Sequence, residues 1–194
     1  SIYDLIIWPK NATKPFDKIS NEKAEFISIP SSNPDEKITF VISRAENPLT
    51  GNPIVVFGHG NGERMKDYYY ENDFCPHGIS ICTVDYRGYG FSDGKYGTSC
   101  FTEPDDIITI IKYLKENGFE KVSYFGRSLG ATCGIFVAAE FPDLVCVALD
   151  SPWLSTREWT KYKADFFNDI KSEKFEKLLP TVYQKIKEKT WLDF

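Results

Sequence analysis

The alternation of apolar runs and helical segments constrains the fold of this chain more than any other feature. From residue 54 onward, short continuous apolar runs stop at glycines or turn residues, as fully buried parallel strands do. Two intervening segments, 103–118 and 128–141, have the apolar spacing of helices. Such an order predicts a mostly parallel sheet with helices on both faces. The runs that we predict as strands are "NPIVVFGHG", "ISICTVDY", "KVSYFG" and "LVCVALD".

The whole chain fits one domain of the α/β class. Its 194 residues, of which 42% are apolar, are enough to build one sizeable core. Residues 1–23 are predicted to be an irregular lead-in, and residues 24–194 to form the domain. Two strand-like runs, 25–30 and 38–45, precede the alternation and are expected to form an antiparallel edge. After Pro152 the sequence becomes amphipathic with helical spacing.

Composition and charge exclude several classes of function. The net charge is −5 and the lysines are scattered, which gives no basis for binding nucleic acid. No apolar run approaches the roughly 18 residues of a membrane span, and "VYQKIKEK" lacks an apolar face for interfacial insertion. An odd number of cysteines without a C-x-x-C pair favours small buried thiols in a reducing compartment over a disulfide or zinc framework. We therefore expect a cytoplasmic protein. The five cysteines are Cys75, Cys82, Cys100, Cys133 and Cys146.

The most informative motif is "GRSLG", residues 126–130, which stands where a predicted strand passes directly into a predicted helix. A G-x-S-x-G motif in this context predicts a nucleophile elbow, a tight turn that exposes the serine oxygen at a helix N-terminus. Gly126 and Gly130 would leave room for that turn. We therefore predict that Ser128 is a catalytic nucleophile. The alternative is a serine that only caps the helix.

Acyl transfer also requires hydrogen-bond donors for the oxyanion of the tetrahedral intermediate. The backbone N–H of Leu129, the residue after the serine, is predicted to be one donor. The second is expected in the loop "HGNGER" after the first buried strand, where we choose the backbone N–H of Asn61. The alternatives for this loop are a flexible glycine turn or a weak phosphate cradle, although it lacks the lysine of a P-loop.

Taken together, these motifs resemble the α/β-hydrolase superfamily, and more narrowly its Bem46-like and palmitoyl-protein thioesterase-like branch. The resemblance is carried by "GHGNG", "VDYRGYGFSDGKYG", "EPDDI", "GRSLGA" and "LDSPW", in that order. It implies a serine hydrolase that acts on an ester or thioester through an acyl-enzyme, without a metal or organic cofactor. It also implies that Asp85 and Arg87 organise their loop and do not take part in catalysis.

A serine nucleophile needs a general base, and this chain has two histidines. His77 precedes a strand and Ser128 follows one, so about 17 Å of parallel sheet separates them, which a hydrogen bond cannot bridge. His59 is on the correct edge, but it begins the predicted oxyanion loop and is expected to organise it; the alternative is that it acts as the base. Asp150 ends the last predicted strand and would orient a histidine only if one were present.

Two explanations therefore stay open. In the first, these residues are the N-terminal part of a longer hydrolase whose acid and histidine follow Phe194. In the second, the chain is complete and serves as an inactive binding or interaction module. We favour the first, because the elbow and the oxyanion loop are intact in the sequence. It predicts that strand 144–150 is the outermost parallel strand and that the apolar side chains beside it are exposed or covered by another copy of the chain.

The substrate is less well defined by the sequence. In the family that this chain resembles, the segment after the sixth strand often provides cap helices over the pocket. Trp153, Trp159 and Tyr162 lie in that segment and could contact an apolar acyl chain. The alternative is that these aromatic residues only pack the helices onto the core. A small-molecule acyl ester is the partner that we expect.

Overall fold

The computed structural model describes residues 24–65, 70–94, 97–98 and 100–155, together with residues 180 and 184. The predicted lead-in, the segment that contains Trp159 and Tyr162, and the amphipathic stretches near the C-terminus lie outside these residues. The strands are β1 (Ala24–Pro30), β2 (Lys37–Ser43), β3 (Ile54–Gly58), β4 (Ser80–Asp85), β5 (Val122–Arg127) and β6 (Val147–Asp150). The helices are α2 (Glu71–Phe74), the 3-10 helix η2 (Cys75–His77), α3 (Glu103–Glu116) and α4 (Leu129–Glu140).

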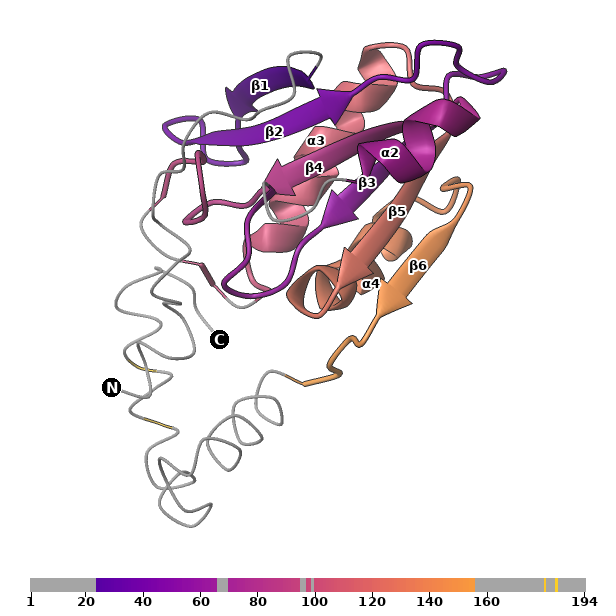
Figure 1. The fold of residues 1–194 in the computed structure, drawn as a ribbon. Helices are drawn as coiled ribbons and strands as arrows, with labels where there is room; N and C mark the ends of the chain where they lie inside the picture. Colours follow the sequence, from indigo (N-terminus) through magenta and orange to yellow (C-terminus); the bar gives the residue numbers. More distant parts are fainter. Residues whose placement is uncertain are drawn as a thin grey trace.

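The strands form one six-stranded sheet in the order β1-β2-β4-β3-β5-β6. β1 pairs with β2, and β2 with β4, in antiparallel orientation, whereas the pairs β3–β4, β3–β5 and β5–β6 are parallel. Figure 1 shows α3 and α4 on one face of this sheet and the short α2 on the other. The predicted parallel sheet with an antiparallel edge is confirmed.

The core lies between the sheet and the two helices α3 and α4 that cover one of its faces. In α3 the buried apolar residues follow helical spacing, and they meet strand residues that are themselves fully buried. The helix begins at Glu103, with Pro104 and three acidic residues in its first turn, which suits the positive end of its dipole. It ends two residues before Gly118, whose φ is +89°. The helical residues of this core include Ile107, Ile110, Ile111, Leu114, Leu129, Cys133 and Val137.

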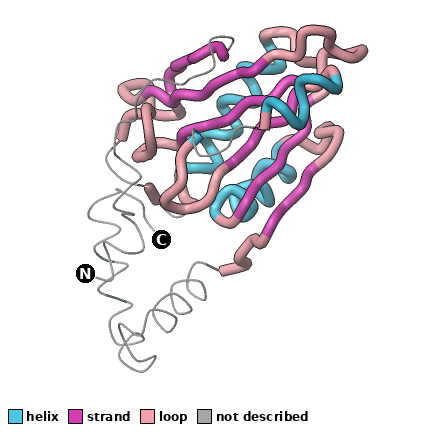
Figure 2. The backbone as a smooth tube through the Cα atoms, in the orientation of Figure 1, coloured by secondary structure: helices cyan, strands magenta, loops and turns pink. Residues whose placement is uncertain are grey.

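The C-terminal strand is shorter than the sequence predicts. We expected residues 144–150, but β6 spans Val147–Asp150, because Leu144 closes a turn by donating its N–H to the carbonyl of Phe141. Figure 2 shows β6 at the end of the sheet beside β5, so this strand is the outermost parallel strand, as predicted. Apolar side chains on and next to it are exposed, among them Val145 (63%) and Val147 (36%), which is also as predicted.

This edge position corrects one expectation about the cysteines. The sequence places Cys146 in an apolar run and predicts that it is buried, but its side chain is exposed. Cys82 and Cys133 are buried, whereas Cys75 and Cys100 are only partly covered. An apolar run in an edge strand does not bury its residues in the way that the same run in a central strand does.

Candidate active site

Ser128 lies in the tight connection between β5 and α4, and its backbone is strained. Its φ is +52° and its ψ is −110°, a conformation that side-chain-bearing residues rarely adopt. The turn is closed so tightly that a Cβ atom on Gly126 would lie 2.4 Å from the carbonyl oxygen of Gly130. The N–H of Ser128 donates to the carbonyl of Asp150 at 2.8 Å, which ties the turn to the end of β6. The local geometry is that of a nucleophile elbow.

The elbow packs directly against the loop that follows β3. The N–H of Gly130 donates to the carbonyl of His59 at 3.0 Å, and the Tyr86 hydroxyl donates to the same carbonyl at 3.0 Å. A Cβ atom on Gly130 would lie only 2.1 Å from the carbonyl oxygen of Gly58. The structure therefore brings the two segments that carry the predicted oxyanion donors into backbone contact.

Two side chains hold the loop around Asn61 in place. The Glu63 carboxylate accepts a hydrogen bond from the N–H of Gly60 at 2.6 Å. The Tyr89 hydroxyl donates to Oδ1 of Asn61 at 2.9 Å. The N–H of Gly60 is therefore already used within the loop. The contacts of Glu63 and Tyr89 could not be anticipated from the motif, because nothing in the sequence marks which side chains reach this loop.

His59 is buried in this loop and is held in its neutral form. Burial lowers the pKa of His59 to about 4. The hydrogen bond between Nδ1 and the carbonyl of Gly60, at 2.8 Å, raises the pKa, but by less than burial lowers it. Its Nε2 lies 4.0 Å from Oδ1 of Asp85, which is too long for a hydrogen bond. The ring packs against Tyr86 in a tilted arrangement and against Tyr89 edge-to-face, with centroids 4.3 and 5.1 Å away. These contacts fit an organiser of the loop better than a mobile proton acceptor.

His77 ends the 3-10 helix η2, which leads into the start of β4. The parallel registers align Ser80 of β4 with Ile54 of β3, and Ile54 with Val122 of β5. His77 is therefore at the edge of the sheet where these strands begin, whereas Ser128 follows the end of β5. Within the described part of the chain, the Ser128 hydroxyl makes no hydrogen bond to either imidazole.

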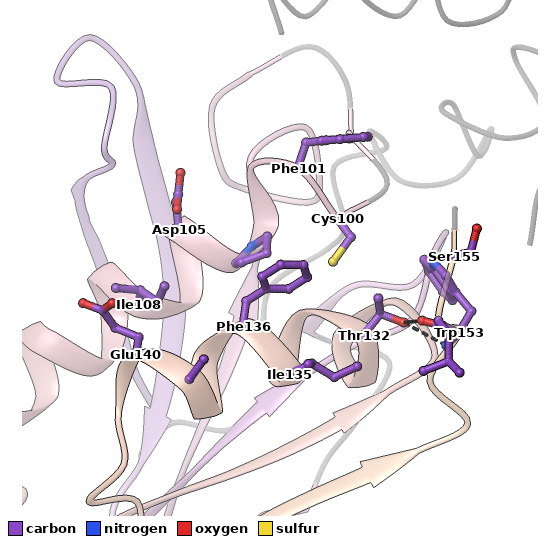
Figure 3. Close-up of a pocket in the computed structure, with 13 residues that line it drawn as sticks. Cys100, Phe101, Asp105, Ile108, Thr132, Ile135, Phe136, Glu140, Trp153 and Ser155 are labelled. Atoms are coloured by element: carbon purple, nitrogen blue, oxygen red, sulfur yellow. Dashed lines mark hydrogen bonds between the residues drawn. The ribbon is translucent and has the colours of Figure 1, made fainter. Parts of the chain in front are cut away.

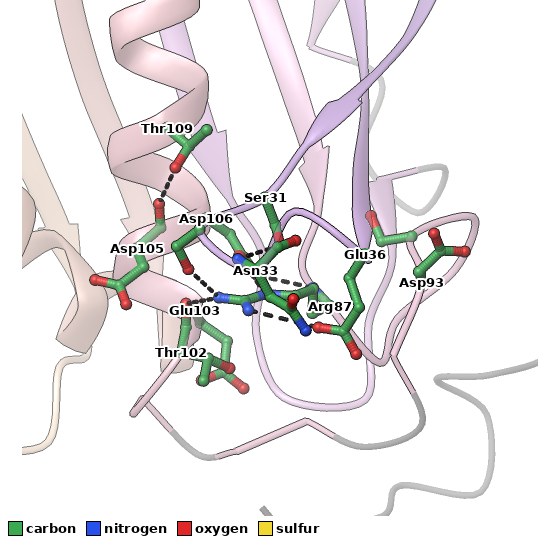
Figure 4. A network of polar contacts seen from close by, with 12 residues as sticks. Ser31, Asn33, Glu36, Arg87, Asp93, Thr102, Glu103, Asp105, Asp106 and Thr109 are labelled. Atoms are coloured by element: carbon green, nitrogen blue, oxygen red, sulfur yellow. Dashed lines mark hydrogen bonds and ion pairs between the residues drawn. The ribbon is translucent and has the colours of Figure 1, made fainter. Parts of the chain in front are cut away.

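Asp85 and Arg87 bind loop backbone and buried side chains. The Asp85 carboxylate accepts from the N–H of Met65 at 2.8 Å and from the N–H of Phe91 at 3.0 Å. Nε of Arg87 donates to Oδ1 of Asp106 at 2.6 Å, and its backbone N–H donates to Oδ2 at 2.8 Å (Figure 4). Burial raises the pKa of Asp106 to about 7, against the lowering effect of Arg87. Asp85 thus joins the loops that follow β3 and β4, and Arg87 joins the loop after β4 to α3.

Asp150 is exposed at the end of β6, and its side chain binds close neighbours. Its Oδ1 accepts from the Ser151 hydroxyl at 2.7 Å, and its Oδ2 lies 3.8 Å from Nε of Arg127. Both members of this ion pair are about half exposed, so it contributes little to stability. The more direct link to the site is the backbone carbonyl of Asp150, which fixes Ser128.

A pocket of about 770 Å³ lies between the start of α3, the outer face of α4 and the residues after β6. Figure 3 shows that aromatic and aliphatic side chains from these three segments surround it. Trp153 lines the pocket and also packs against the core, and its backbone is fixed by the hydroxyl of Thr132. Ser128 is not one of its lining residues, so the pocket lies beside the elbow.

The described residues contain neither a membrane-spanning helix nor a cluster of metal ligands. None of the described helices is both long enough and apolar enough to cross a bilayer. No three histidine, cysteine, aspartate or glutamate side chains in the described ranges come together as metal ligands.

The six-stranded, mostly parallel sheet and the elbow after its fifth strand define an α/β-hydrolase fold. An esterase of Pyrococcus furiosus, Pf2001, has this fold, with a TM-score of 0.66 and 19% identity over 89% of this chain and 68% of that chain. Epoxide hydrolase VrEH1 from Vigna radiata shares it, with a TM-score of 0.56 and 22% identity over 70% of this chain and 43% of that chain. At such identities the likeness shows the fold alone.

The family follows from a match over most of the chain. A family model described as "Serine aminopeptidase, S33" matches residues 51–192, and the chain belongs to this α/β-hydrolase family. Human Protein ABHD12B is 31% identical over 120 residues, which are 56% of this chain and 31% of that protein. The "Uncharacterized membrane protein YNL320W" of Saccharomyces cerevisiae is 33% identical over 89 residues, covering 44% of this chain and 31% of that protein. The matches span about a third of the length of these relatives.

Proposed function

We propose that Ser128 is the nucleophile of a serine hydrolase that cleaves an ester or thioester. The observation that carries this proposal is the strained backbone of Ser128 at a strand–helix junction, with φ at +52° and the helix N-terminus beside it. Its oxygen would attack the substrate carbonyl to form a tetrahedral intermediate. Collapse of that intermediate would release an alcohol or thiol and leave an acyl-enzyme, which water then hydrolyses. This sequence of steps needs no metal or organic cofactor.

The oxyanion would be bound by the backbone N–H groups of Leu129 and Asn61. Leu129 begins α4, so its N–H lies at the positive end of the helix dipole. The choice of Asn61 is supported by the bond between Gly60 and Glu63, which occupies the preceding N–H of the loop. The bond from Gly130 to His59 supports a fixed distance between the two donors.

The general base would come from outside these 194 residues. His59 is buried and engaged with the loop, and His77 lies at the opposite edge of the sheet. The matched segments make up 31% of the length of each of these relatives, so we propose that the acid and the histidine lie in a part of the protein outside these residues. The 194-residue chain by itself is then expected to be inert towards activated esters.

The choice of an ester or thioester rests on the resemblance to Bem46-like and thioesterase-like proteins, and on esterases among the structures of the same fold. A small acyl ester is the proposed partner. The pocket beside Trp153 is a place where an apolar acyl chain could be bound, because Phe101, Ile108 and Phe136 also line it. Hydrolysis of short and long acyl esters by Trp153→Ala separates acyl binding from packing, since only acyl binding predicts a loss that grows with chain length.

A fluorophosphonate probe tests the nucleophile in the protein expressed from its complete coding sequence. We expect a single phosphonylated serine in the peptide that contains Ser128, and no labelling of Ser128→Ala. Ser151→Ala is the matched control, because Ser151 is an exposed serine with positive φ at the end of the neighbouring strand. Full labelling of Ser128→Ala would rule out the assignment.

The second candidate function is an inactive binding or interaction module. Within the described residues the Ser128 hydroxyl makes no hydrogen bond to either histidine, and this favours the binding module, because a serine without a base is a poor nucleophile. The coding sequence and the reaction with the fluorophosphonate probe distinguish the two functions. A coding sequence that ends at Phe194, together with a folded protein that the probe does not label, would support the binding module and contradict the hydrolase.

A further inference from the structure

Cys100 and Cys133 form a thiol pair beside the elbow helix. Their sulfur atoms lie 3.2 Å apart, although 33 positions separate the two residues in the sequence. Among the described residues no other two cysteines make a sulfur–sulfur contact, and none of the five is in a disulfide. The contact therefore joins the loop before α3 to α4, the helix that starts next to Ser128.

The loop that carries Cys100 is held in a conformation that brings its thiol to α4. Cys100 has a φ of +79°, which is strained for a residue with a side chain. The fully buried carboxylate of Glu103 fixes this loop by accepting from the N–H of Cys100 at 2.9 Å and from the N–H and hydroxyl of Thr98 at 2.6 and 2.5 Å. The position of the thiol thus does not depend on a freely moving loop.

The two thiols differ in their access to solvent. Cys100 is partly exposed and lines the pocket (Figure 3), so a small oxidant can reach its sulfur. Cys133 is buried in α4, and burial, reinforced by the neighbouring Cys100 thiol, raises its pKa. An oxidant in the pocket therefore reacts at Cys100, and Cys133 is positioned to react with the product.

We propose that Cys100 and Cys133 are a reversible oxidation site that forms a disulfide between the α3 loop and the elbow helix. A hydroperoxide would transfer one oxygen to Cys100, giving a sulfenic acid and releasing an alcohol, or water if the oxidant is hydrogen peroxide. The Cys133 sulfur then bonds to the Cys100 sulfur, and the hydroxyl leaves as water with the Cys133 proton. The two thiols lose two electrons in total, which the hydroperoxide gains. This site does not depend on the proposed hydrolase activity.

The required movement is small. A disulfide has an S–S distance of about 2.05 Å, so the two sulfurs must approach by roughly 1.1 Å. Rotation of the partly exposed Cys100 side chain can supply part of that movement. The bond would then close a loop of about 33 residues, which restricts the unfolded chain and favours the folded state.

Exposure of the folded protein to hydrogen peroxide, followed by alkylation of free thiols and peptide mass mapping, tests the proposal. We expect a mass loss of about 2 Da, for two hydrogens, and a cross-linked peptide pair that contains Cys100 and Cys133 and disappears with a reductant. Oxidation in a denaturant should remove the preference for this pair. Stepwise oxidation of Cys100 to sulfinic acid without a cross-link would overturn the proposal.

Two variants keep the test independent of folding defects. Cys100→Ser changes the partly exposed member of the pair and should abolish the cross-link while the circular dichroism spectrum stays unchanged. Cys146→Ser is the matched control, because Cys146 is the exposed cysteine, and this variant should cross-link as the unmodified protein does. If Cys133 still forms a cross-link with another cysteine in Cys100→Ser at the same rate, or if the Cys100–Cys133 cross-link is lost in Cys146→Ser, the pair is not the oxidation site.

Discussion

The N–H of Gly130 donates a hydrogen bond to the carbonyl of His59 at 3.0 Å, so the elbow helix and the loop after β3 share a backbone contact. The approach is possible only because residue 130 has no side chain. The Tyr124 hydroxyl donates to the carbonyl of Gly130 at 2.7 Å, which completes the fixation of this residue from the side of β5. Any change that separates the two segments should therefore affect stability and, under the proposed function, the reactivity of Ser128.

Gly130→Ala tests this relationship. The new Cβ would lie 2.1 Å from the carbonyl oxygen of Gly58 and 2.9 Å from the Tyr86 hydroxyl, so backbone must move. Alanine gains about 1 kcal/mol in helix propensity, but overpacking costs roughly 1–3 kcal/mol. We expect a net loss of up to about 2 kcal/mol in urea unfolding. In the protein that reacts with fluorophosphonate, we also expect labelling of Ser128 to slow at least tenfold.

Gly134→Ala is the matched control on the same helix. Its Cβ would meet side-chain atoms of Leu149 and Tyr124, at 2.5 and 2.6 Å, and no backbone of the β3 loop. It should lower stability without a comparable effect on the labelling rate. An equal loss of labelling in both variants would mean that helix stability, and not the contact with His59, determines the reactivity of Ser128.

The second prediction concerns the protonation of His59. Its pKa is lowered to about 4, because burial disfavours the charged ring. The unfolded chain, with a pKa of about 6.5, therefore takes up a proton first as the pH falls. The contribution of neutral His59 to stability is complete above pH 6.5 and is progressively lost towards pH 4, by about 2 kcal/mol between pH 7 and pH 5. Ring NMR shifts should show one imidazole that titrates near pH 4.

Asp106 changes stability in the opposite direction to His59 between pH 7 and pH 5. Its pKa is raised to about 7, so the folded state holds a proton that the unfolded chain releases near pH 4, and stability falls as the pH rises. The two effects nearly cancel in the unmodified protein. His59→Asn should be about 2 kcal/mol more stable at pH 5 than at pH 7, and Asp106→Asn about 2 kcal/mol less stable. If the free energy of unfolding changed with pH in the same direction in both variants, this assignment of protons to His59 and Asp106 would be contradicted.

The third prediction tests Tyr89 as a positioning residue for the proposed oxyanion loop. Tyr89→Phe removes the hydroxyl that donates to Oδ1 of Asn61 at 2.9 Å, at a cost of about 1 kcal/mol in stability. If Asn61 binds the oxyanion, kcat for ester hydrolysis should fall about tenfold with little change in KM, since the bond acts in the transition state. Tyr113→Phe, on α3 and away from the loop, is the control. A change in KM alone would assign Tyr89 to substrate binding.

The fold could be predicted from the sequence to a large extent, because local patterns carry the information. Apolar runs that stop at glycines indicated the parallel strands, and the glycines around Ser128 indicated the turn into α4. The position of Cys146 was predicted wrongly, because burial depends on the neighbours of a strand and not on its own residues. The bonds of Tyr89 to Asn61 and of Glu103 to Thr98 join side chains whose proximity no periodicity encodes.

The last prediction concerns Glu103, which holds the loop of Cys100. The buried carboxylate of this residue accepts three hydrogen bonds, two of them from backbone N–H groups. Glu103→Ala would leave these donors unsatisfied in a buried site, and we expect a loss of roughly 2–4 kcal/mol in urea unfolding. Asp105→Ala is the matched control, because Asp105 carries the same charge in the first turn of α3 but is exposed, and it should change stability by less than about 0.5 kcal/mol.

Glu103→Ala and Asp105→Ala also distinguish the role of Glu103 in holding the Cys100 loop from its role at the start of α3. Where Glu103→Ala still folds, the strained Cys100 backbone is released, so the cross-link to Cys133 should form more slowly than in Asp105→Ala under identical peroxide. Equal rates would show that Glu103 supports the start of α3 alone, and that contacts of Cys100 with α4 are enough to hold the two sulfurs together.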